Sequence, residues 1–370
     1  DESGTTDTFT VVLDAEPASD VVLTVTSSDP GEATVTSTLT FTSANWDNAQ
    51  TVTVTGVDDN LIDGTIGSTI TVAVEDANSD DDFDAVADQT VSVTTTDDDV
   101  AGFTIVESDG TTSVDESGTT DTFTIVLDAQ PTSDVVLTIS SNDTGETTTT
   151  GTLTFSPVNW DTPQTITITG VDDDIIDGTV TSTITISVVD ASSNDNFDSV
   201  ADQTVSATTT DDDVAGFTIV ESDGSTEVDE SGTTDTFTVV LDAEPNSDVV
   251  LTISSDDTGE ATVTNALTFS SANWDTPQTI TITGADESIL DGNQDTTITV
   301  TIDDANSDNN FDSVADQTIS ATTTDDDVAG FTIVESDGST EVAESGTTDT
   351  FTIVLDAEPT EDVVLSVTSG

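Results

Sequence analysis

The sequence predicts an all-β protein, built as a tandem array of small antiparallel sandwiches. Three observations support this prediction. A block of 114 residues recurs along the chain, since DESGTTDTFT begins at Asp1, Asp115 and Asp229 and returns as AESGTTDTFT at Ala343. Within each block, short apolar runs alternate with Thr, Ser or Asp, which is the period-two pattern of half-buried strands. No stretch has the apolar spacing of an amphipathic helix.

The repeat length fits one small domain better than one turn of a solenoid. VAGFTIVESDG follows TTTDDD at Val100, Val214 and Val328, and we take this Val as the start of a domain. The expected domains are residues 1–99 without a first strand, complete repeats at 100–213 and 214–327, and a partial repeat of three strands at 328–370. We therefore expect a slice of a longer array, formed either by one continuous chain or by copies that donate strands to each other.

The strands are predicted from the apolar runs of the second repeat. They are Phe103–Val106, Thr122–Leu127, Val135–Ser140, Thr152–Ser156, Gln164–Thr169, Thr181–Val188 and Thr204–Thr209. Thr, Val and Ile dominate these runs, and β-branched side chains suit a pleated sheet. Seven strands joined by polar turns predict a seven-stranded antiparallel sandwich of immunoglobulin-like type. One Trp in each repeat is expected to plug the core: Trp46, Trp160 and Trp274.

The composition excludes several classes of function. The chain has 77 Asp and Glu residues, no Lys, Arg, His or Cys, and a formal net charge of −77. Without Lys or Arg, nucleic acid and anionic membranes are poor partners. Without His or Cys, zinc sites with nitrogen or sulfur ligands, the commonest general base and the thiol nucleophile are absent. No apolar run is long enough for a membrane span. Carboxylate pairs can hydrolyse glycosides, but no Tyr, Arg or His is present to orient a sugar, so we expect no enzyme.

Three acid-rich motifs, VDESG, GVDDDIIDG and TTTDDD, recur in the repeats. If consecutive strands reverse direction, alternate connections lie at the same end of a sandwich, so these motifs are expected to meet there. Two carboxylates about 5 Å apart repel by about 3 kcal/mol at an effective dielectric of about 20. The acids must therefore extend into water, bind protons or bind metal, and flexible loops of hard oxygen ligands favour Ca²⁺ over Mg²⁺. The alternative is a solvated acidic surface adapted to high salt, which better suits scattered acids such as Asp14 and Asp20.

The motifs TTTDDDVAGFTIVES, VDESGTTDTFTIVLD and ITGVDDDIIDG resemble the Calx-β domain, the calcium-binding sandwich of sodium–calcium exchangers and many bacterial surface proteins. The resemblance covers every repeat and implies that the acids of the three motifs are calcium ligands. In this sequence they are Glu2, Asp58, Asp59, Asp63, Asp97, Asp98 and Asp99, then Glu116, Asp172, Asp173, Asp177, Asp211, Asp212 and Asp213, then Glu230, Asp286, Glu287, Asp291, Asp325, Asp326 and Asp327.

The sequence departs from the family pattern at two places. The family often has a GSDY-like segment after the third strand, whereas this chain has SSDPGE, SSNDTGE and SSDDTGE, in which Asp29, Asp143 and Asp257 are candidate substitutes. Glu287 also replaces an Asp in the third repeat. The number of ions per repeat stays open, and we expect two or more. A further acid-rich loop at 79–84, 193–198 and 307–312 is expected at the opposite end, as a solvated turn rather than a ligand at the domain junction.

These features predict a calcium-stiffened extracellular fibre or adhesin stalk. TTTDDD joins VAGF without a Gly/Ser linker, so neighbouring repeats should nearly touch and lie head to tail, with calcium near each junction. Sites with affinities of about 10⁻⁴–10⁻³ M fit extracellular modules. The expected partners are calcium ions and neighbouring repeats or copies, at the cell surface. The alternative is a calcium-sensing regulatory module of a larger surface protein, and a flanking effector, anchor or ligand-binding head would discriminate the two.

Overall fold

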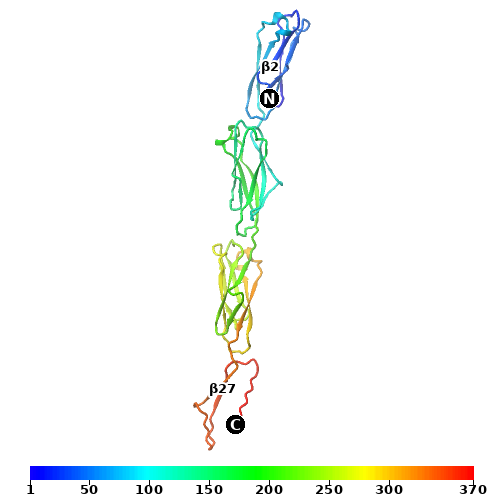
Figure 1. The fold of residues 1–370 in the computed structure, drawn as a ribbon. Helices are drawn as coiled ribbons and strands as arrows, with labels where there is room; N and C mark the ends of the chain where they lie inside the picture. Colours follow the sequence, from blue (N-terminus) through cyan, green and yellow to red (C-terminus); the bar gives the residue numbers. More distant parts are fainter. The chain divides into compact units, whose positions relative to one another are not determined.

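The computed structural model describes all 370 residues, and nearly all of its regular secondary structure is β-strand (Figure 1). Internal contacts divide the chain into two units, Asp1–Asp172 with Val180–Thr210 and Asp173–Thr179 with Asp211–Gly370. The helices are six short 3-10 turns, η1 (Asp76–Asn78), η2 (Asp81–Phe83), η3 (Asp190–Ser192), η4 (Asp195–Phe197), η5 (Asp304–Asn306) and η6 (Asn309–Phe311). None has the length and hydropathy that crossing a membrane requires.

The first unit contains two sandwiches. The first consists of β1 (Thr6–Val11), β2 (Val21–Ser27), β3 (Ala33–Val35), β4 (Thr38–Phe41), β5 (Gln50–Gly56), β6 (Ile66–Val74) and β7 (Gln89–Thr95). The second consists of β8 (Phe103–Glu107), β9 (Thr112–Asp115), β10 (Thr120–Leu127), β11 (Val135–Ser141), β12 (Thr147–Thr149), β13 (Thr152–Phe155), β14 (Gln164–Gly170), β15 (Val180–Val188) and β16 (Gln203–Thr210). The sheet orders are β1-β5-β3 with β4-β2-β6-β7, and β12-β14-β10-β8 with β13-β11-β15-β16-β9.

The second unit contains the third sandwich and a two-stranded sheet. The sandwich consists of β17 (Phe217–Glu221), β18 (Thr226–Asp229), β19 (Thr234–Leu241), β20 (Val249–Ser255), β21 (Ala261–Val263), β22 (Ala266–Phe269), β23 (Gln278–Gly284), β24 (Gln294–Ile302) and β25 (Gln317–Thr324). Its sheets, β17-β19-β23-β21 and β18-β25-β24-β20-β22, repeat the order of the second sandwich. The remaining sheet pairs β26 (Phe331–Glu335) with β27 (Phe351–Leu355).

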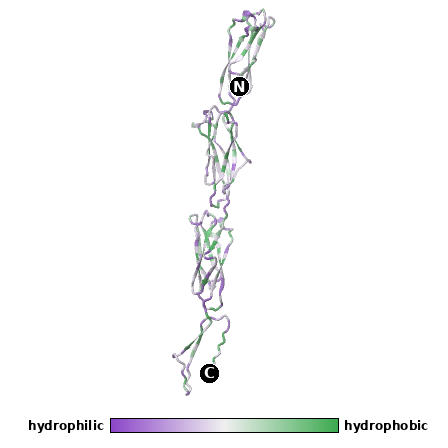
Figure 2. Cartoon of the chain, viewed as in Figure 1, coloured by the Kyte–Doolittle hydropathy of each residue, from purple (hydrophilic) through white to green (hydrophobic).

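The period-two pattern places alternate side chains in the core. On β11, Val135, Leu137 and Ile139 are buried, whereas the Val and Thr residues between them are half-buried. Apolar residues lie along the strands and hydrophilic residues gather in the connections (Figure 2). Fully buried Phe residues from both sheets, such as Phe123 and Phe155, hold each core together, and replacing one by Ala typically costs about 3–5 kcal/mol. The predicted tandem array of antiparallel sandwiches is confirmed.

The structure adds two short strands to the seven predicted in a complete repeat. β12 is a separate strand before β13, and β9 pairs with β16 in parallel. The chain crosses from one sheet to the other between β8 and β9. Trp160 and Trp274 pack against the cores of their sandwiches, as expected, and both are partly buried. Residues 362–367 form no strand, because residues 328–370 contain no counterparts of β13 and β15, which flank β11 in the second sandwich.

The first sandwich lacks counterparts of β8 and β9. In the second sandwich, β8 pairs with β10 in the same sheet, and Phe123 and Ile125 of β10 are fully buried. The equivalent Phe9 and Val11 are half-buried and line an open hollow of about 540 Å³. The difference shows how much of each core depends on the strand that opens the repeat.

Candidate metal centre

Four connections bring acidic residues together at one end of the first sandwich, which we call the acid end. Glu2 precedes β1, Glu32 lies between β2 and β3, Asp63 lies between β5 and β6, and Asp97 follows β7. Backbone bonds fix these segments, since the amide of Glu2 donates to the Thr96 carbonyl at 3.1 Å. Similarly, the amide of Val57 donates to the Glu32 carbonyl at 2.9 Å. The meeting of these connections follows from strands that alternate in direction.

The carboxylates form two groups that share Glu2. One oxygen from each of Glu2, Glu32 and Asp63 lies within 4.8 Å of the others, and the same holds for Glu2, Asp97 and Asp99. Glu2 and Glu32 are buried, with 1% and 7% of their surface exposed, whereas the three Asp residues are half-buried. The loop after β5 is tied to the end of β7, because the amide of Gly64 donates to Asp97 Oδ2 at 2.8 Å.

The charge state of this cluster is strongly perturbed. Burial, followed by repulsion from Glu32, Asp59, Asp97 and Asp63, raises the pKa of Glu2 to about 7. Burial and neighbouring carboxylates also raise the pKa of Glu32, although a hydrogen bond with Glu2 partly offsets the effect. The pKa values of Asp63 and Asp99 are raised for the same two reasons. A proton is therefore easier to hold here than on an ordinary surface carboxylate.

Several buried oxygens of this cluster accept no hydrogen bond. They are Glu2 Oε2, Glu32 Oε2 and Asp63 Oδ1. An unsatisfied buried acceptor typically costs about 1–3 kcal/mol, and more when it is charged. The chain has no Lys, Arg or His side chain that could neutralise these groups. The cluster thus provides hard, negatively charged oxygen atoms, several of which accept no hydrogen bond, and this fits a divalent cation.

The third sandwich repeats the arrangement. Oxygens of Glu230, Asp325 and Asp327 lie within 4.8 Å of one another. Burial, followed by repulsion from Asp325, Glu260 and Glu287, raises the pKa of Glu230 to about 7, although the amide of Asp326 acts in the opposite direction. Neither carboxylate oxygen of Glu230 makes a well-formed hydrogen bond. Burial, followed by repulsion from other acids, also raises the pKa values of Glu260 and Glu287.

The equivalent acids of the second sandwich belong to both units. In the first unit, Glu116 and Glu146 are buried. In the second unit, Asp211 accepts hydrogen bonds from the amides of Gly178 and Asp213, both at 2.7 Å. Burial, followed by repulsion from Asp211, Asp174, Asp212 and Asp173, raises the pKa of Asp213 to about 6.

The structure separates the predicted ligands into inner and outer residues. The inner residues are buried or half-buried, while the outer ones are exposed: Asp58, Asp59, Asp98, Asp172, Asp177, Asp212, Asp286, Asp291 and Asp326. Outer residues still act at short range, since Asp98 and Asp59 contribute to the raised pKa of Asp99. Their negative charge would attract a cation toward the inner group.

Sequence reasoning missed one set of residues, Glu32, Glu146 and Glu260. Each follows Gly in the turn after the second long strand of its sandwich and is buried. The interpretation of this turn favoured Asp29, Asp143 and Asp257, but these are exposed, and Asp29 Oδ1 accepts a hydrogen bond from the Gly31 amide at 3.1 Å. The recurrence of Gly-Glu in all three turns was the signal available in the sequence.

Comparisons with known proteins find structural similarity only. No family model matches the chain, and no curated protein matches it. Among solved structures, the chain is similar to the crystal structure of CBD12 from CALX1.2, with 17% identity, a TM-score of 0.24 and coverage of 54% of this chain and 78% of that one. It is also similar to domains 4–9 of the surface layer protein SbsC, with 17% identity, a TM-score of 0.26 and coverage of 85% and 40%.

The I-band fragment I67–I69 from titin is a third similar structure, with 10% identity, a TM-score of 0.28 and coverage of 87% of this chain and 93% of that one. All three TM-scores are below 0.5, so the function must be argued from the residues of this chain.

Proposed function

We propose that this chain is part of an extracellular structural fibre or adhesin stalk, in which calcium stabilises tandem β-sandwich domains. The observation that carries the proposal is the buried acid cluster, where carboxylate oxygens lack hydrogen-bond donors and no basic side chain exists to neutralise them. At about 5 Å and an effective dielectric of about 20, each pair of carboxylates repels by about 3 kcal/mol. A divalent cation would convert this repulsion into attraction.

The proposed ligands follow from the geometry. Glu2 would bridge two ions, one held with Glu32 and Asp63 and the other with Asp97 and Asp99. In the third sandwich, Glu230 would hold an ion with Asp325 and Asp327. The other predicted acids would act as further ligands or as a surrounding negative field. Flexible loops that supply several oxygens fit Ca²⁺ better than Mg²⁺, which demands strict octahedral geometry.

The proposed role is structural rather than catalytic, with one domain per repeat. We propose domains at 1–99, 100–213, 214–327 and 328–370. Calcium affinities of about 10⁻⁴–10⁻³ M are typical of extracellular modules, where the ion is abundant. The large uncompensated charge supports the same setting, since the self-repulsion of a chain with net charge −77 destabilises the folded state and bound cations would offset it.

The test is titration of the chelator-treated chain with calcium chloride at low ionic strength, followed by thermal unfolding. We expect calorimetric heat from more than one site per complete sandwich. At a calcium concentration one hundred times the dissociation constant, each site should add about 2.7 kcal/mol. Magnesium chloride is the matched control, and monovalent salt should recover only part of the effect, because screening provides no coordination. Absence of heat, with equal melting temperatures in chelator and in calcium, would refute the proposal.

A further inference from the structure

The loop between β5 and β6 carries an apolar tip between acids of the proposed metal site. Leu61 and Ile62 form this tip, with Asp59 before it and Asp63 after it. Asp59 Oδ1 accepts a hydrogen bond from the Leu61 amide at 2.7 Å. The base of the loop is held by the bond from the Gly64 amide to Asp97. The acid end therefore fixes the position of two apolar residues.

This tip contacts the second sandwich within the first unit. Leu61 forms a parallel β-bridge with Gln130, in the turn between β10 and β11. The Ile62 amide donates to the Gln130 carbonyl at 3.2 Å, and the Gln130 amide donates to the Asn60 carbonyl at 2.6 Å. The side chain of Ile62 packs against the core of the second sandwich. Asn196 Nδ2 then donates to the Ile62 carbonyl at 2.9 Å.

The second unit contains the same contact. Ile175 forms a parallel bridge with Glu244, and Ile176 packs against the core of the third sandwich. Here two amide side chains hold the Ile176 carbonyl, since Asn246 Nδ2 donates at 2.7 Å and Asn310 Nδ2 at 2.8 Å. Asn310 occupies the position of Asn196 in its own repeat.

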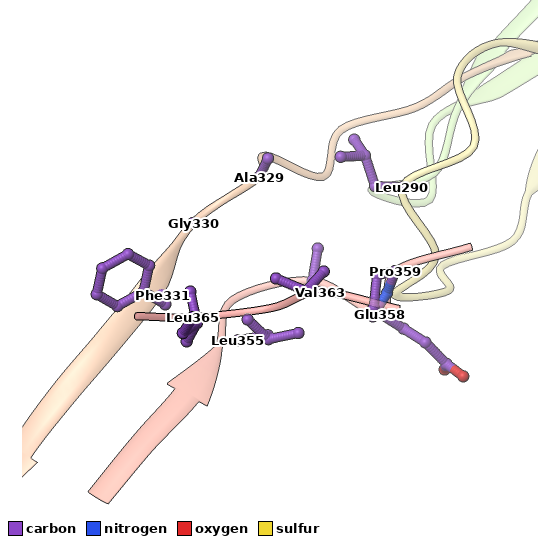
Figure 3. A pocket seen from close by; sticks show the side chains of 10 residues that line it. Leu290, Ala329, Gly330, Phe331, Leu355, Glu358, Pro359, Val363 and Leu365 are labelled. Atoms are coloured by element: carbon purple, nitrogen blue, oxygen red, sulfur yellow. The ribbon is translucent and has the colours of Figure 1, made fainter. Parts of the chain in front are cut away.

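A third example lies at the loop between β23 and β24. Ile289 bridges to Glu358, and the Leu290 amide donates to the Glu358 carbonyl at 3.1 Å. Figure 3 shows Leu290 on this loop, while Pro359, Phe331 and Val363 come from the following repeat. Together they line a hollow of about 390 Å³. Phe331 and Val363, which line it, are each 51% exposed.

We infer that the apolar tip of each metal-site loop is a docking element, whose partner is the next copy of the same domain. The tip supplies one β-bridge and one aliphatic side chain, which is half-buried at Ile62 and Ile176 and exposed at Leu290. The partner supplies the turn Ala-Gln/Glu-Pro and, in the first two contacts, an Asn amide. The same contact forms in three places along the chain, although the residues differ in detail. The docking itself is argued from these contacts alone. The expectation that calcium strengthens docking rests on the proposed function, because two linked events, calcium binding and docking, stabilise each other.

The domains differ at the residue that would donate to the tip carbonyl. The first sandwich has Asp82 where the others have Asn196 and Asn310. A carboxylate cannot donate a hydrogen bond to a tip carbonyl and would repel it. We therefore expect a domain with Asp at this position to accept a tip less firmly.

The test measures the distance between the first two sandwiches in the full chain, which contains no Cys. Spin labels are placed at the equivalent exposed positions by Thr40→Cys and Thr154→Cys, and double electron–electron resonance gives the distance distribution in calcium and in chelator. We expect Ile62→Ser to widen the distribution at least twofold. Asn196→Ala should widen it less, and Asn196→Asp more than Asn196→Ala. Leu290→Ser is the matched control, because it alters a tip that lies outside the labelled pair.

The outcomes separate docking from calcium binding. Equal widths for the parent, Ile62→Ser and Asn196→Asp chains in both buffers would overturn the inference. If the parent chain binds no calcium in calorimetry but Ile62→Ser still widens the distribution in chelator, the proposed function fails and docking stands. Should Ile62→Ser lower the β-sheet circular-dichroism signal, the comparison rests on Asn196→Ala and Asn196→Asp, which alter an exposed side chain.

Discussion

The two ends of the first sandwich are both rich in acids, but the hydrogen bonding of their buried carboxylates differs. At the acid end, Glu2 and Glu32 are buried with oxygens that accept no hydrogen bond. At the other end, between β6 and β7, Asp80 is also buried, yet its oxygens accept hydrogen bonds from the amides of Ser19 at 2.8 Å and Asp82 at 3.1 Å. These backbone bonds lower the pKa of Asp80, whereas burial and like charges raise the pKa of Glu2 to about 7.

The comparison shows that acid content alone does not mark a cation site. Asp80 caps the short turn η2 and is already satisfied by the fold. Glu2 and Glu32 become satisfied only if something from outside the chain, a proton or a cation, enters the cluster. The two ends should therefore respond in different ways to pH and to mutation.

The largest expected difference is the response of the metal-free protein to pH. In the folded protein, the pKa values of Glu2 and Glu230 are raised to about 7, above the 4.5 that is usual for a Glu side chain. A raised pKa means that the folded state binds protons more tightly, so stability is highest below about pH 4.5 and falls as pH rises through 7. We expect the melting temperature in chelator to fall by at least about 5 °C between pH 5 and pH 8, since about 1 kcal/mol shifts such a domain by about 4–8 °C.

In calcium, the melting temperature should instead rise with pH, because protons compete with the ion for the same oxygens. Scanning calorimetry across the pH range, with and without calcium, measures both slopes. Asp80 does not confound the experiment, since its lowered pKa affects stability only below about pH 4. A metal-free melting temperature that rises between pH 5 and pH 8 would contradict the account of the acid end.

At the acid end, part of the candidate site could be predicted from the sequence and part could not. The alternation of strand direction was sufficient to predict that Glu2, Asp63 and Asp97 lie at one end, and the structure places them there. It was not sufficient for Glu32, because an acid after Gly in a turn looks solvent-exposed, and only the packing of β2 and β3 on the rest of the sandwich buries it. Which of these residues bind an ion stays a prediction.

The contacts between domains were less predictable. Direct TTTDDD–VAGF junctions indicated that neighbours lie close, but strand periodicity says nothing about which loops meet. The tip residues Leu61 and Ile62 were interpreted only as part of an acid-rich turn. Their partner, Gln130, is 69 positions away in sequence, and neither pattern nor charge links the two.

A second way to test the comparison is to remove one unsatisfied carboxylate. Glu230→Gln keeps the shape of the side chain but removes a charge that Asp325, Glu260 and Glu287 repel. In chelator at pH 7.5, we expect the third sandwich to gain about 1 kcal/mol, because relief of repulsion of about 3 kcal/mol exceeds the cost of about 1–3 kcal/mol for a poorly bonded amide. In calcium, the same variant should lose stability and calorimetric uptake at that sandwich. A variant that melts lower than the parent in both buffers would mean that Glu230 is satisfied within the fold.

An effect of similar size but opposite sign in chelator is expected from the matched change at the other end, Asp308→Asn. Asp308 accepts hydrogen bonds from the amides of Asn310 at 3.0 Å and Ser247 at 2.8 Å. Asn194 occupies the same position in the second sandwich, where its oxygen accepts from the Asn196 amide at 3.0 Å and its amide donates to Thr132 Oγ1 at 2.6 Å. Asn at 308 would therefore keep the cap of η6 and lose the acceptor for Ser247.

We expect this loss to cost about 0.5–1.5 kcal/mol, the net contribution of one hydrogen bond. The sign is the same in chelator and in calcium, because the residue lies at the end of the sandwich away from the acid cluster. Calcium uptake should equal that of the parent chain in calorimetry. If Asp308→Asn instead stabilised the metal-free protein or reduced calcium uptake, its carboxylate would behave like that of Glu230. The distinction between a carboxylate that backbone amides satisfy and one that is satisfied only by a bound cation or proton would then be wrong.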